Sequence, residues 1–315
     1  MMGRVAPSPN WSEAWGGFDA AVAGAVNFLA GAQDADGAWR DFRLPVGRAE
    51  AWTTALVGRV LSGTGQPDAD PLAHRAATWL TRTAPAGRWG YNAEVPPDAD
   101  STAWAALLLD RVRLDQNTTI ADLCFVASHR IPEGGFATYR AADGWGEAHA
   151  CVTPVALMAT ETRLGLDPGA RSWLAACRDA DGAVRGHWWT SAFYPTLMAR
   201  TVLGPVAGGD PFRSPALSRI GSAFDLACAT LLAALDAPEC TATRRLAATL
   251  AGLQRPDGGW PASRCLRVTP HWLGASGVAQ GGHVPGAVFA DDRRTVSTVF
   301  AAAALAVVSG QGAWP

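Results

Sequence analysis

The chain has 315 residues, of which 49% are hydrophobic and 17% are charged, enough to bury a large core in one large domain or two small ones. The formal net charge of −2 provides no basic field for nucleic acid or anionic lipid, so neither is expected as a partner. The six cysteines include no C-x-x-C pair, which argues against a disulfide framework or a zinc finger. The N-terminus has no apolar signal region and no apolar run is long enough to span a bilayer, so we expect a cytoplasmic protein without an integral membrane segment.

A short turn motif recurs along the chain. Residues 33–39 (QDADGAW) and 254–260 (QRPDGGW) share the pattern Q-x-x-D-G-x-W. Weaker copies are residues 84–89 (APAGRW), 131–136 (IPEGGF) and 177–184 (CRDADGAV). The first four copies recur at roughly 50 residues, and the fifth arrives late. This recurrence predicts a repeat architecture in which one repeat lacks its turn.

Each copy of the motif lies between two kinds of helical segment. The segments before it, such as 18–32, 70–82 and 240–253, carry apolar residues at spacings of three and four. The segments after it are more uniformly apolar, and they are 49–61, 100–112, 150–164, 189–203, 222–235 and 294–308. A helix that is apolar all round is buried on all sides. The chain is therefore predicted to form five to six helix pairs, each with one half-exposed and one buried helix.

Helix pairs of this kind can close into a ring. We expect an all-α fold, an (α/α)5-6 toroid formed by residues 1–315 as a single domain, with the apolar helices inside. A straight solenoid would need polar capping repeats, and none is seen. Because every turn leads from an outer helix to the start of an inner helix, all inner-helix starts should meet at one end of the toroid.

Polar residues gather at these expected inner-helix starts. The expected inner helices share a small or polar step near their starts, at Thr54-Ala55, Thr102-Ala103, Thr153-Pro154, Ser191-Ala192, Ser222-Ala223 and Thr298-Val299. The residues just before these steps are Glu50, Asp98, Asp100, His149, Cys151, His187, Trp189 and Arg294. Isolated burial of charged groups is costly, so these side chains are expected to be solvated or paired for a purpose. Taken alone, Asp98 or Asp100 is equally well interpreted as an N-cap, and a lone His149 is more often a capping or satisfied polar residue.

Two further features favour a binding site. The inner helices carry the aromatic residues Trp52, Trp104, Trp189, Phe193, Phe224 and Phe300. Their rings either pack in the core or line a cavity with π faces that stabilise cations, whereas Trp39, Trp89 and Trp260 of the turns are expected to be structural wedges. Residues 261–291 show no periodicity, and an unstructured insertion of that size in a compact domain is usually functional or disordered. We expect it to form a lid loop over the site.

The turns resemble the QW repeats of the squalene–hopene cyclase and oxidosqualene cyclase superfamily. In that superfamily the QW repeats hold the helices of an αα toroid together. Residues 98–103 (DADSTA) resemble the DxDD-T-A signature of class II terpene cyclases. They are closer still to the DxDT variant of terpene-cyclase β domains fused to haloacid-dehalogenase-like phosphatases. The resemblance implies that Asp100 is the general acid and that Asp98 raises its acidity. Ser101 stands where many members have the last aspartate.

The resemblance implies a class II-like terpene cyclase of bacterial secondary metabolism, an isomerase of terpenoid biosynthesis. Protonation of a C=C bond needs a carboxylic acid with a raised pKa, which an apolar cavity and a neighbouring carboxylate provide. One toroid is small for a C30 chain, so the expected substrate is farnesyl or geranylgeranyl diphosphate or a prenylated small molecule. His149, His187 or water would take the final proton.

Substrate binding is expected to fall to side chains at the same mouth. They are Trp52, Trp104, His187, Trp189, Phe193, Phe224, Arg294 and Phe300. No cofactor and no protein-bound metal is expected, except Mg²⁺ if the substrate carries a diphosphate. In that case Arg294 or Arg293, with the helix N-termini, would anchor the diphosphate.

Two alternatives stay open. The same toroid occurs in protein prenyltransferase β subunits, and Asp98, Asp100, His149 and Cys151 can be interpreted as zinc ligands. The first D-x-C element and a lysine-rich diphosphate site of those enzymes are missing here. The second alternative is a non-catalytic toroid that binds a hydrophobic ligand. The chain length of the substrate, its head group and the oligomeric state, including a homodimer, are left open.

Overall fold

Six apolar helices contact one another in a closed ring. The structure is a computed structural model that describes residues 11–84, 87–112, 120–140, 145–204, 216–269 and 286–314. The ring consists of α2 (Ala51–Leu61), α4 (Ala99–Val112), α6 (Thr153–Leu164), α8 (Phe193–Leu203), α9 (Ala223–Asp236) and α12 (Thr295–Val308). Each helix contacts the next, and α12 returns to α2. All residues of α12 except Val307 are buried, as expected for a helix that is apolar all round.

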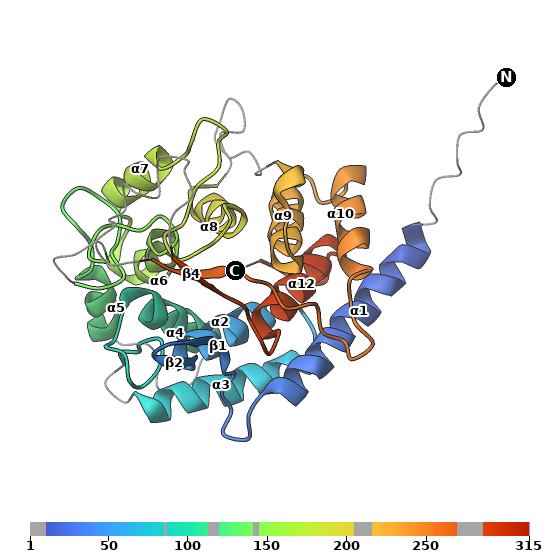
Figure 1. The fold of residues 1–315 in the computed structure, drawn as a ribbon, viewed down its shortest axis with the longest axis horizontal. Helices are drawn as coiled ribbons and strands as arrows, with labels where there is room; N and C mark the ends of the chain where they lie inside the picture. Colours follow the sequence, from blue (N-terminus) through green and yellow to red (C-terminus); the bar gives the residue numbers. More distant parts are fainter. Residues whose placement is uncertain are drawn as a thin grey trace.

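A second set of helices surrounds this ring (Figure 1). It consists of α1 (Trp11–Ala32), α3 (Ala69–Thr83), α5 (Ile120–Ala127), α7 (Pro168–Ala176) and α10 (Thr241–Ala251), and a 3-10 turn, η1 (Leu217–Arg219), precedes α9. The outer helices α3, α5, α7 and α10 each lie against two inner ones, whereas α1 packs mainly on α12; α3, for example, contacts α2 and α4. The α3 helix buries Leu72, Ala73, Ala76 and Leu80, which recur at spacings of three and four. The predicted all-α toroid is confirmed, with six inner and five outer helices in the described part of the chain.

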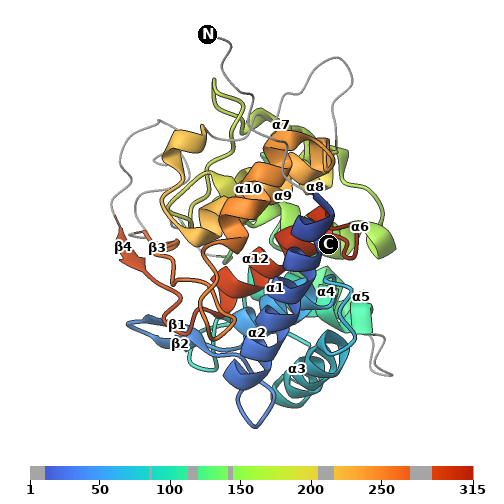
Figure 2. The same ribbon diagram turned by 90° about the vertical axis from the view of Figure 1, so that its right-hand side faces the viewer.

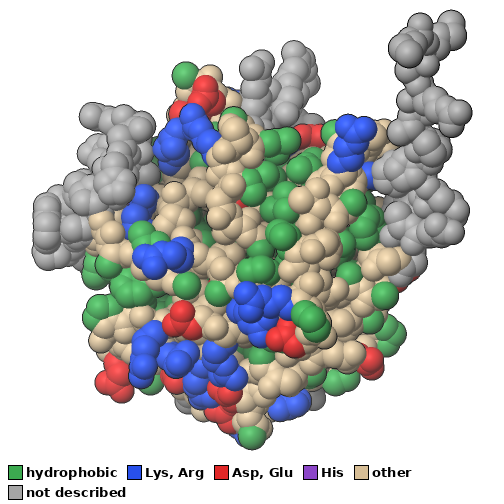
Figure 3. Space-filling view, turned by 45° about the vertical axis from the view of Figure 1, so that its right-hand side comes forward, with side chains coloured by type: hydrophobic (Ala, Val, Ile, Leu, Met, Phe, Trp, Pro, Cys, Tyr) green, Lys and Arg blue, Asp and Glu red, His purple; other side chains and the backbone are tan. Residues whose placement is uncertain are grey.

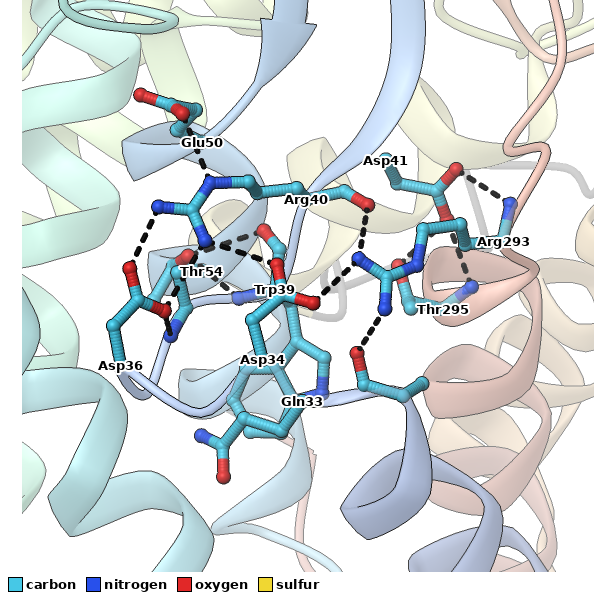
Figure 4. A network of polar contacts seen from close by, with 12 residues as sticks. Gln33, Asp34, Asp36, Trp39, Arg40, Asp41, Glu50, Thr54, Arg293 and Thr295 are labelled. Atoms are coloured by element: carbon cyan, nitrogen blue, oxygen red, sulfur yellow. Dashed lines mark hydrogen bonds and ion pairs between the residues drawn. The ribbon is translucent and has the colours of Figure 1, made fainter.

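The repeated turns bind outer helices to inner ones. In the first turn, Gln33 Nε2 donates to the carbonyl of Leu72 on the next outer helix at 3.0 Å. The backbone N–H of Trp39 donates to Thr54 Oγ1 on the inner helix at 3.0 Å, and the Trp39 indole caps the carbonyl of Leu29. Figure 4 shows Gln33, Trp39 and Thr54 in this network. Gly37 has φ +101°, and a Cβ atom there would lie 2.7 Å from a backbone oxygen, so only glycine fits.

The same hydrogen bond recurs in every copy of the turn and gives the true alignment of the inner helices. The backbone N–H of Trp89, Phe136, Val184 and Trp260 donates to the hydroxyl of Thr102, Thr153, Thr196 and Thr298, respectively. Thr196 therefore occupies the place that we assigned to Ser191. The prediction of a helix over 189–203 is wrong at its start, because Thr190 N–H bonds the carbonyl of Cys265 and holds this stretch as a loop until α8 begins.

Two small hairpins lie at the end of the ring where the inner helices begin, which we call the mouth. Strand β1 (Asp41–Leu44) pairs with β2 (Gly47–Ala49), and β3 (Leu266–Val268) pairs with β4 (Ala287–Phe289). The segment 261–291 thus contains regular structure that its sequence did not predict. Residues 270–285 of the expected lid lie outside the described residues, and the lid stays a prediction.

The C-terminal segment covers the opposite end of the ring. Ala313 N–H bonds the carbonyl of Gly63, just after α2, at 2.9 Å. The Trp314 indole donates to Thr201 Oγ1 at 2.7 Å, and its ring lies 5.5 Å from that of Phe300. Figure 2 shows the strands on one side of the inner helices and the C-terminus on the other. In the described part of the chain, the C-terminal segment therefore fills this end of the ring and leaves the mouth as the open end.

The surface mixes charges of both signs. On the face shown in Figure 3, arginine side chains gather in the lower half and acidic side chains lie beside several of them. No helix of the described residues combines the length and the apolar character needed to cross a membrane.

Candidate active site

A cavity of about 330 Å³ opens at the mouth. Its walls come from the β1–β2 hairpin, the starts of α2 and α4, the loops before α6 and α8, and β3. The lining residues are Leu44, Pro45, Val46, Trp52, Tyr91, Val95, Asp98, Asp100, Ser101, Thr138, Tyr139, Trp145, Trp188, Trp189, Leu266 and Val268. Among these described lining residues, Asp98 and Asp100 are the only two acids and no basic residue occurs. The rest of the wall is mostly aromatic or aliphatic.

Asp98 caps the helix that carries both acids. It directly precedes α4 and is 3% exposed. Its Oδ1 accepts from the backbone N–H of Ser101 at 2.8 Å, and its Oδ2 accepts from Ser101 Oγ at 2.7 Å. A carboxylate that accepts from the third helical residue is a typical N-cap. The capping role that the sequence left open between the two acids therefore falls to Asp98, and Ser101 holds both of its oxygens.

Asp100 is in a different environment. It is partly exposed to the cavity, and its Oδ2 accepts from the indole Nε1 of Trp52 at 2.9 Å. Its Oδ1 is buried and has no hydrogen-bond partner in the described part of the chain. Unlike Asp98, Asp100 therefore has a carboxyl oxygen that nothing in the described protein satisfies.

Both carboxyl groups have raised pKa values. Burial raises the pKa of Asp98 to about 7, against the hydrogen bonds from Ser101 that lower it. Burial also raises the pKa of Asp100 to about 8, and the charge of Asp98 raises it further, whereas the Trp52 hydrogen bond lowers it. Because Asp98 accepts more hydrogen bonds, the coupled pair loses its first proton there. Near neutral pH, Asp100 is left as the carboxylic acid.

His149 and His187 lie behind the cavity wall. Their rings stack with centroids 4.1 Å apart. His149 Nδ1 bonds Thr138 Oγ1 at 2.8 Å, and His187 Nε2 bonds the hydroxyl of Thr269. Burial, His149 and Arg267 lower the pKa of His187 to about 2, so it is neutral. Both histidines are buried without lining the cavity, which Thr138 and Trp188 line instead.

The aromatic residues expected to bind substrate divide into two groups. Trp52 and Trp189 line the cavity. Trp104, Phe193, Phe224 and Phe300 are almost fully buried and are not among the lining residues. The Trp189 ring stacks on that of Phe224 at 5.1 Å, and Phe224 lies 4.8 Å from Phe300. Phe224 and Phe300 therefore fill the ring beneath Trp189 and form the floor under the cavity.

The arginines expected to anchor a diphosphate are occupied elsewhere. Arg294 forms an ion pair with Asp257 at 2.7 Å and lies over the ring of Phe28 at 4.6 Å. Arg293 pairs with Asp34 at 2.9 Å, in the network of Figure 4. Neither is among the described residues that line the cavity, and the expectation that Arg294 binds substrate stays a prediction. The N-terminus of α12 places both side chains against outer-helix turns instead.

The alternative zinc site is not assembled. Asp98 is bonded to Ser101, and His149 to Thr138. Burial raises the pKa of the Cys151 thiol to about 12, which keeps it protonated and a poor ligand. No group of three or more metal-ligating side chains occurs in the described residues.

Several lining residues were missed in the sequence, among them Tyr91, Thr138, Tyr139, Trp145 and Trp188. Tyr91, Thr138 and Tyr139 lie two or three positions after the aromatic residue of a repeated turn. That spacing is a signal that could have identified them. Trp145 and Trp188 lie in loops whose path depends on other parts of the fold, and the sequence carries no comparable signal for them.

The comparisons with solved structures agree with this architecture. The type II terpene cyclase MstE from Scytonema superposes with a TM-score of 0.79 and 25% identity, over 94% of this chain and 99% of MstE. An arginine-to-alanine variant of MstE in complex with the substrate geranylgeranyl dihydroxybenzoate gives the same TM-score at 24% identity. A protein from Actinoplanes gives 0.78 and 26%, over 92% of this chain and 99% of that one.

A more distant match is ent-copalyl diphosphate synthase from Streptomyces platensis. Its TM-score is 0.52 at 17% identity, over 82% of this chain and 50% of that one. No protein-family model and no curated protein matches the chain.

Proposed function

We propose, from the premise that this chain has the fold of the class II terpene cyclases, that it cyclises a prenyl chain by protonating a C=C bond with Asp100. The observation that carries the proposal is the pair of acids at the mouth. Asp98 ionises first because Ser101 donates two hydrogen bonds to it, and Asp100 keeps its proton longer, with a pKa of about 8 in an apolar cavity. Raised pKa values of this kind allow a carboxylic acid to act near neutral pH.

The chemical steps balance without a redox partner. The O–H bond of Asp100 breaks and its electron pair stays on the carboxyl group, while the π electrons of the alkene form a C–H bond. The resulting cation is attacked by further double bonds of the same chain. A final C–H bond loses a proton, which leaves an isomer of the substrate. Trp52, Trp188, Trp189 and Tyr91 line the cavity, and their π faces stabilise cations while the apolar wall excludes water.

The lining favours a substrate without a diphosphate. The described lining residues include no arginine, and the chain contains no lysine. Arg293 and Arg294 form ion pairs with Asp34 and Asp257, respectively. We therefore assign a prenylated small molecule with an uncharged or aromatic head group, the class to which the MstE substrate belongs. Such a molecule offers no diphosphate to Mg²⁺, so the proposed reaction uses no cofactor.

Thr138 connects the cavity to His149. Its side chain lines the cavity, and its hydroxyl bonds His149 Nδ1 at 2.8 Å. The Trp188 indole also donates to Thr138 Oγ1 at 2.8 Å. Through this hydroxyl the imidazole can accept the final proton without contacting the cavity.

The test is incubation of the purified protein with geranylgeranyl dihydroxybenzoate, a farnesyl analogue of it, and farnesyl and geranylgeranyl diphosphate. We expect mass spectrometry to show an isomer of a prenylated aromatic substrate with a changed retention time. Asp100→Asn should lower turnover by at least about 10²-fold, the usual contribution of a general acid. Asp236→Asn, far from the mouth at the end of α9, is the matched control and should keep turnover.

Two outcomes would contradict the proposal. One is the absence of an isomer from all four substrates. The other is an Asp100→Asn variant that turns over like the unmodified protein. Tight binding of a prenylated aromatic without turnover would favour the hydrophobic-ligand-binding toroid instead.

A further inference from the structure

The Trp52 side chain touches the acid and determines where its proton sits. An indole N–H can only donate a hydrogen bond. In a neutral carboxyl group one oxygen carries the proton, and the other, the carbonyl oxygen, is the better acceptor. Since Trp52 Nε1 donates to Oδ2 of Asp100 at 2.9 Å, Oδ2 is the accepting oxygen. The proton is therefore on Oδ1, the oxygen without a hydrogen-bond partner in the described residues.

Aromatic neighbours hold the indole in this orientation. The Trp52 ring lies 5.8 Å from that of Phe42, 6.4 Å from Tyr91 and 6.1 Å from Trp189. The residue is 5% exposed and belongs to the first turn of α2. Tyr91 is itself fixed by its hydroxyl, which donates to the carbonyl of Phe42. Contacts on several sides keep the N–H directed at Asp100.

We propose that Trp52 is a positioning residue that fixes the acid proton of Asp100 on Oδ1 and stabilises the carboxylate left after proton transfer. The second half rests on the proposed function. When the Oδ1–H bond breaks, the electron pair stays on Asp100 and its charge is shared with Oδ2. The Trp52 hydrogen bond then becomes charge-assisted and stronger. An interaction that strengthens along the reaction lowers the barrier, whereas one that is equal in both states does not.

The other titratable groups near Asp100 leave this assignment intact. Asp98 faces it from the same helix and shares its titration. Burial raises the pKa of Tyr139, Cys151 and Tyr194, so these three groups are neutral at working pH. Among the described residues, Trp52 is the only one that donates a hydrogen bond to a carboxyl oxygen of Asp100.

The first test needs no substrate. The carboxyl carbons of aspartate are labelled with ¹³C in the full chain, and the Asp100 signal is identified by its loss in Asp100→Asn. Trp52→Phe removes the N–H and keeps an aromatic ring. In this variant the midpoint of the Asp100 pH titration should rise by about one pH unit, because the carboxylate loses a hydrogen bond that stabilises its charge. In the unmodified protein, the Trp52 indole N–H resonance should shift with the same midpoint as Asp100.

The matched control is Trp188→Phe. Trp188 lines the same cavity, but its indole donates to Thr138 Oγ1 and its ring is not among the described neighbours of Trp52. Its variant should leave the Asp100 midpoint where it is. Circular dichroism confirms that both variants fold. An unchanged midpoint in Trp52→Phe, or an equal rise in Trp188→Phe, would overturn the assignment.

The second test uses whichever prenylated substrate the unmodified protein converts. In Trp52→Phe, kcat should fall by up to about tenfold, and the alkaline limb of its pH profile should move upward with the Asp100 midpoint. A limb that stays in place while the midpoint moves would contradict the role in proton transfer. If the unmodified protein converts no substrate, the proposed function fails, and the titration still decides the assignment of the proton.

Discussion

Two aspartates one residue apart have opposite tasks at the residue scale. Asp98 accepts two hydrogen bonds from Ser101 and caps α4. Asp100 accepts one from Trp52 and keeps a free oxygen. The sequence predicted a pair of acids at an inner-helix start and an acid role for Asp100. It could not predict Trp52 as the partner, because that contact joins residues 48 positions apart through the packing of α2 against α4.

The raised pKa of Asp100 makes a stability prediction. Between about pH 4, where an ordinary aspartate titrates, and its folded-state pKa of about 8, the folded protein holds a proton that the unfolded chain releases. The folded protein therefore loses stability as pH rises through this window. Asparagine cannot ionise, so Asp100→Asn should equal the unmodified protein near pH 4 and exceed it at pH 8–9.

Thermal unfolding midpoints between pH 4 and 9 check this stability prediction. The difference between the two proteins should grow with pH. Parallel curves would show that Asp100 ionises normally, and the account of the acid would be wrong.

At the element scale, the repeated turns could be predicted from the sequence because their residues form hydrogen bonds with the adjacent helices. Gln33 and Trp39 bond partners on neighbouring helices, and the pattern of Q-x-x-D-G-x-W directly encodes those contacts. The start of α8 could not be predicted from the sequence. Apolar and aromatic residues continue from Trp189 into the helix, and only the pairing of Thr190 with Cys265 holds them as a loop. Such tertiary hydrogen bonds leave no periodic signal in the chain.

The turn hydrogen bonds should contribute measurably to stability. Thr298→Val keeps the side-chain shape but removes the acceptor of the Trp260 backbone N–H, which is buried. A buried donor without a partner costs about 1–3 kcal/mol. Urea denaturation should therefore show a loss of that size.

Thr249→Val is the matched control for the turn hydrogen bond. Thr249 lies exposed on α10, where its hydroxyl bonds only a carbonyl of its own helix. This change should stay within about 0.5 kcal/mol of the unmodified protein. Equal effects of the two substitutions would mean that the turn hydrogen bond contributes nothing specific.

At the scale of the whole molecule, the toroid is open at one end and filled at the other. The cavity occupies the mouth, while Phe224, Phe300 and Trp314 occupy the axis below it. From the sequence alone, all the aromatic residues of the inner helices had the same expected role, to pack in the core or to line a cavity. A helix that is apolar all round gives no sign of which side faces the axis, and the depth at which each ring lies depends on where its helix begins. Trp188 and β3 were missed because the segments that carry them show no periodic pattern and their path depends on pairing with distant parts of the chain, as Trp189 pairs with Leu266.

The filled floor limits the length of the substrate. Phe224→Ala removes the ring on which Trp189 stacks and should deepen the cavity. The loss of a buried phenylalanine costs about 3–5 kcal/mol of stability. In competition between farnesyl- and geranylgeranyl-substituted aromatics, product ratios should move toward the longer chain. A ratio that stays constant in a folded variant would show that the floor does not set chain length.

The central claim is that a proton from Asp100 becomes part of the product. The most direct measurement is turnover in D₂O, followed by mass spectrometry and NMR of the product. Because the acid exchanges with solvent before each turnover and the proton lost at the end comes from the substrate, the account predicts one deuterium per product. That deuterium should be on the carbon that was protonated. A product of unchanged mass, or one that Asp100→Asn forms equally fast, would contradict it.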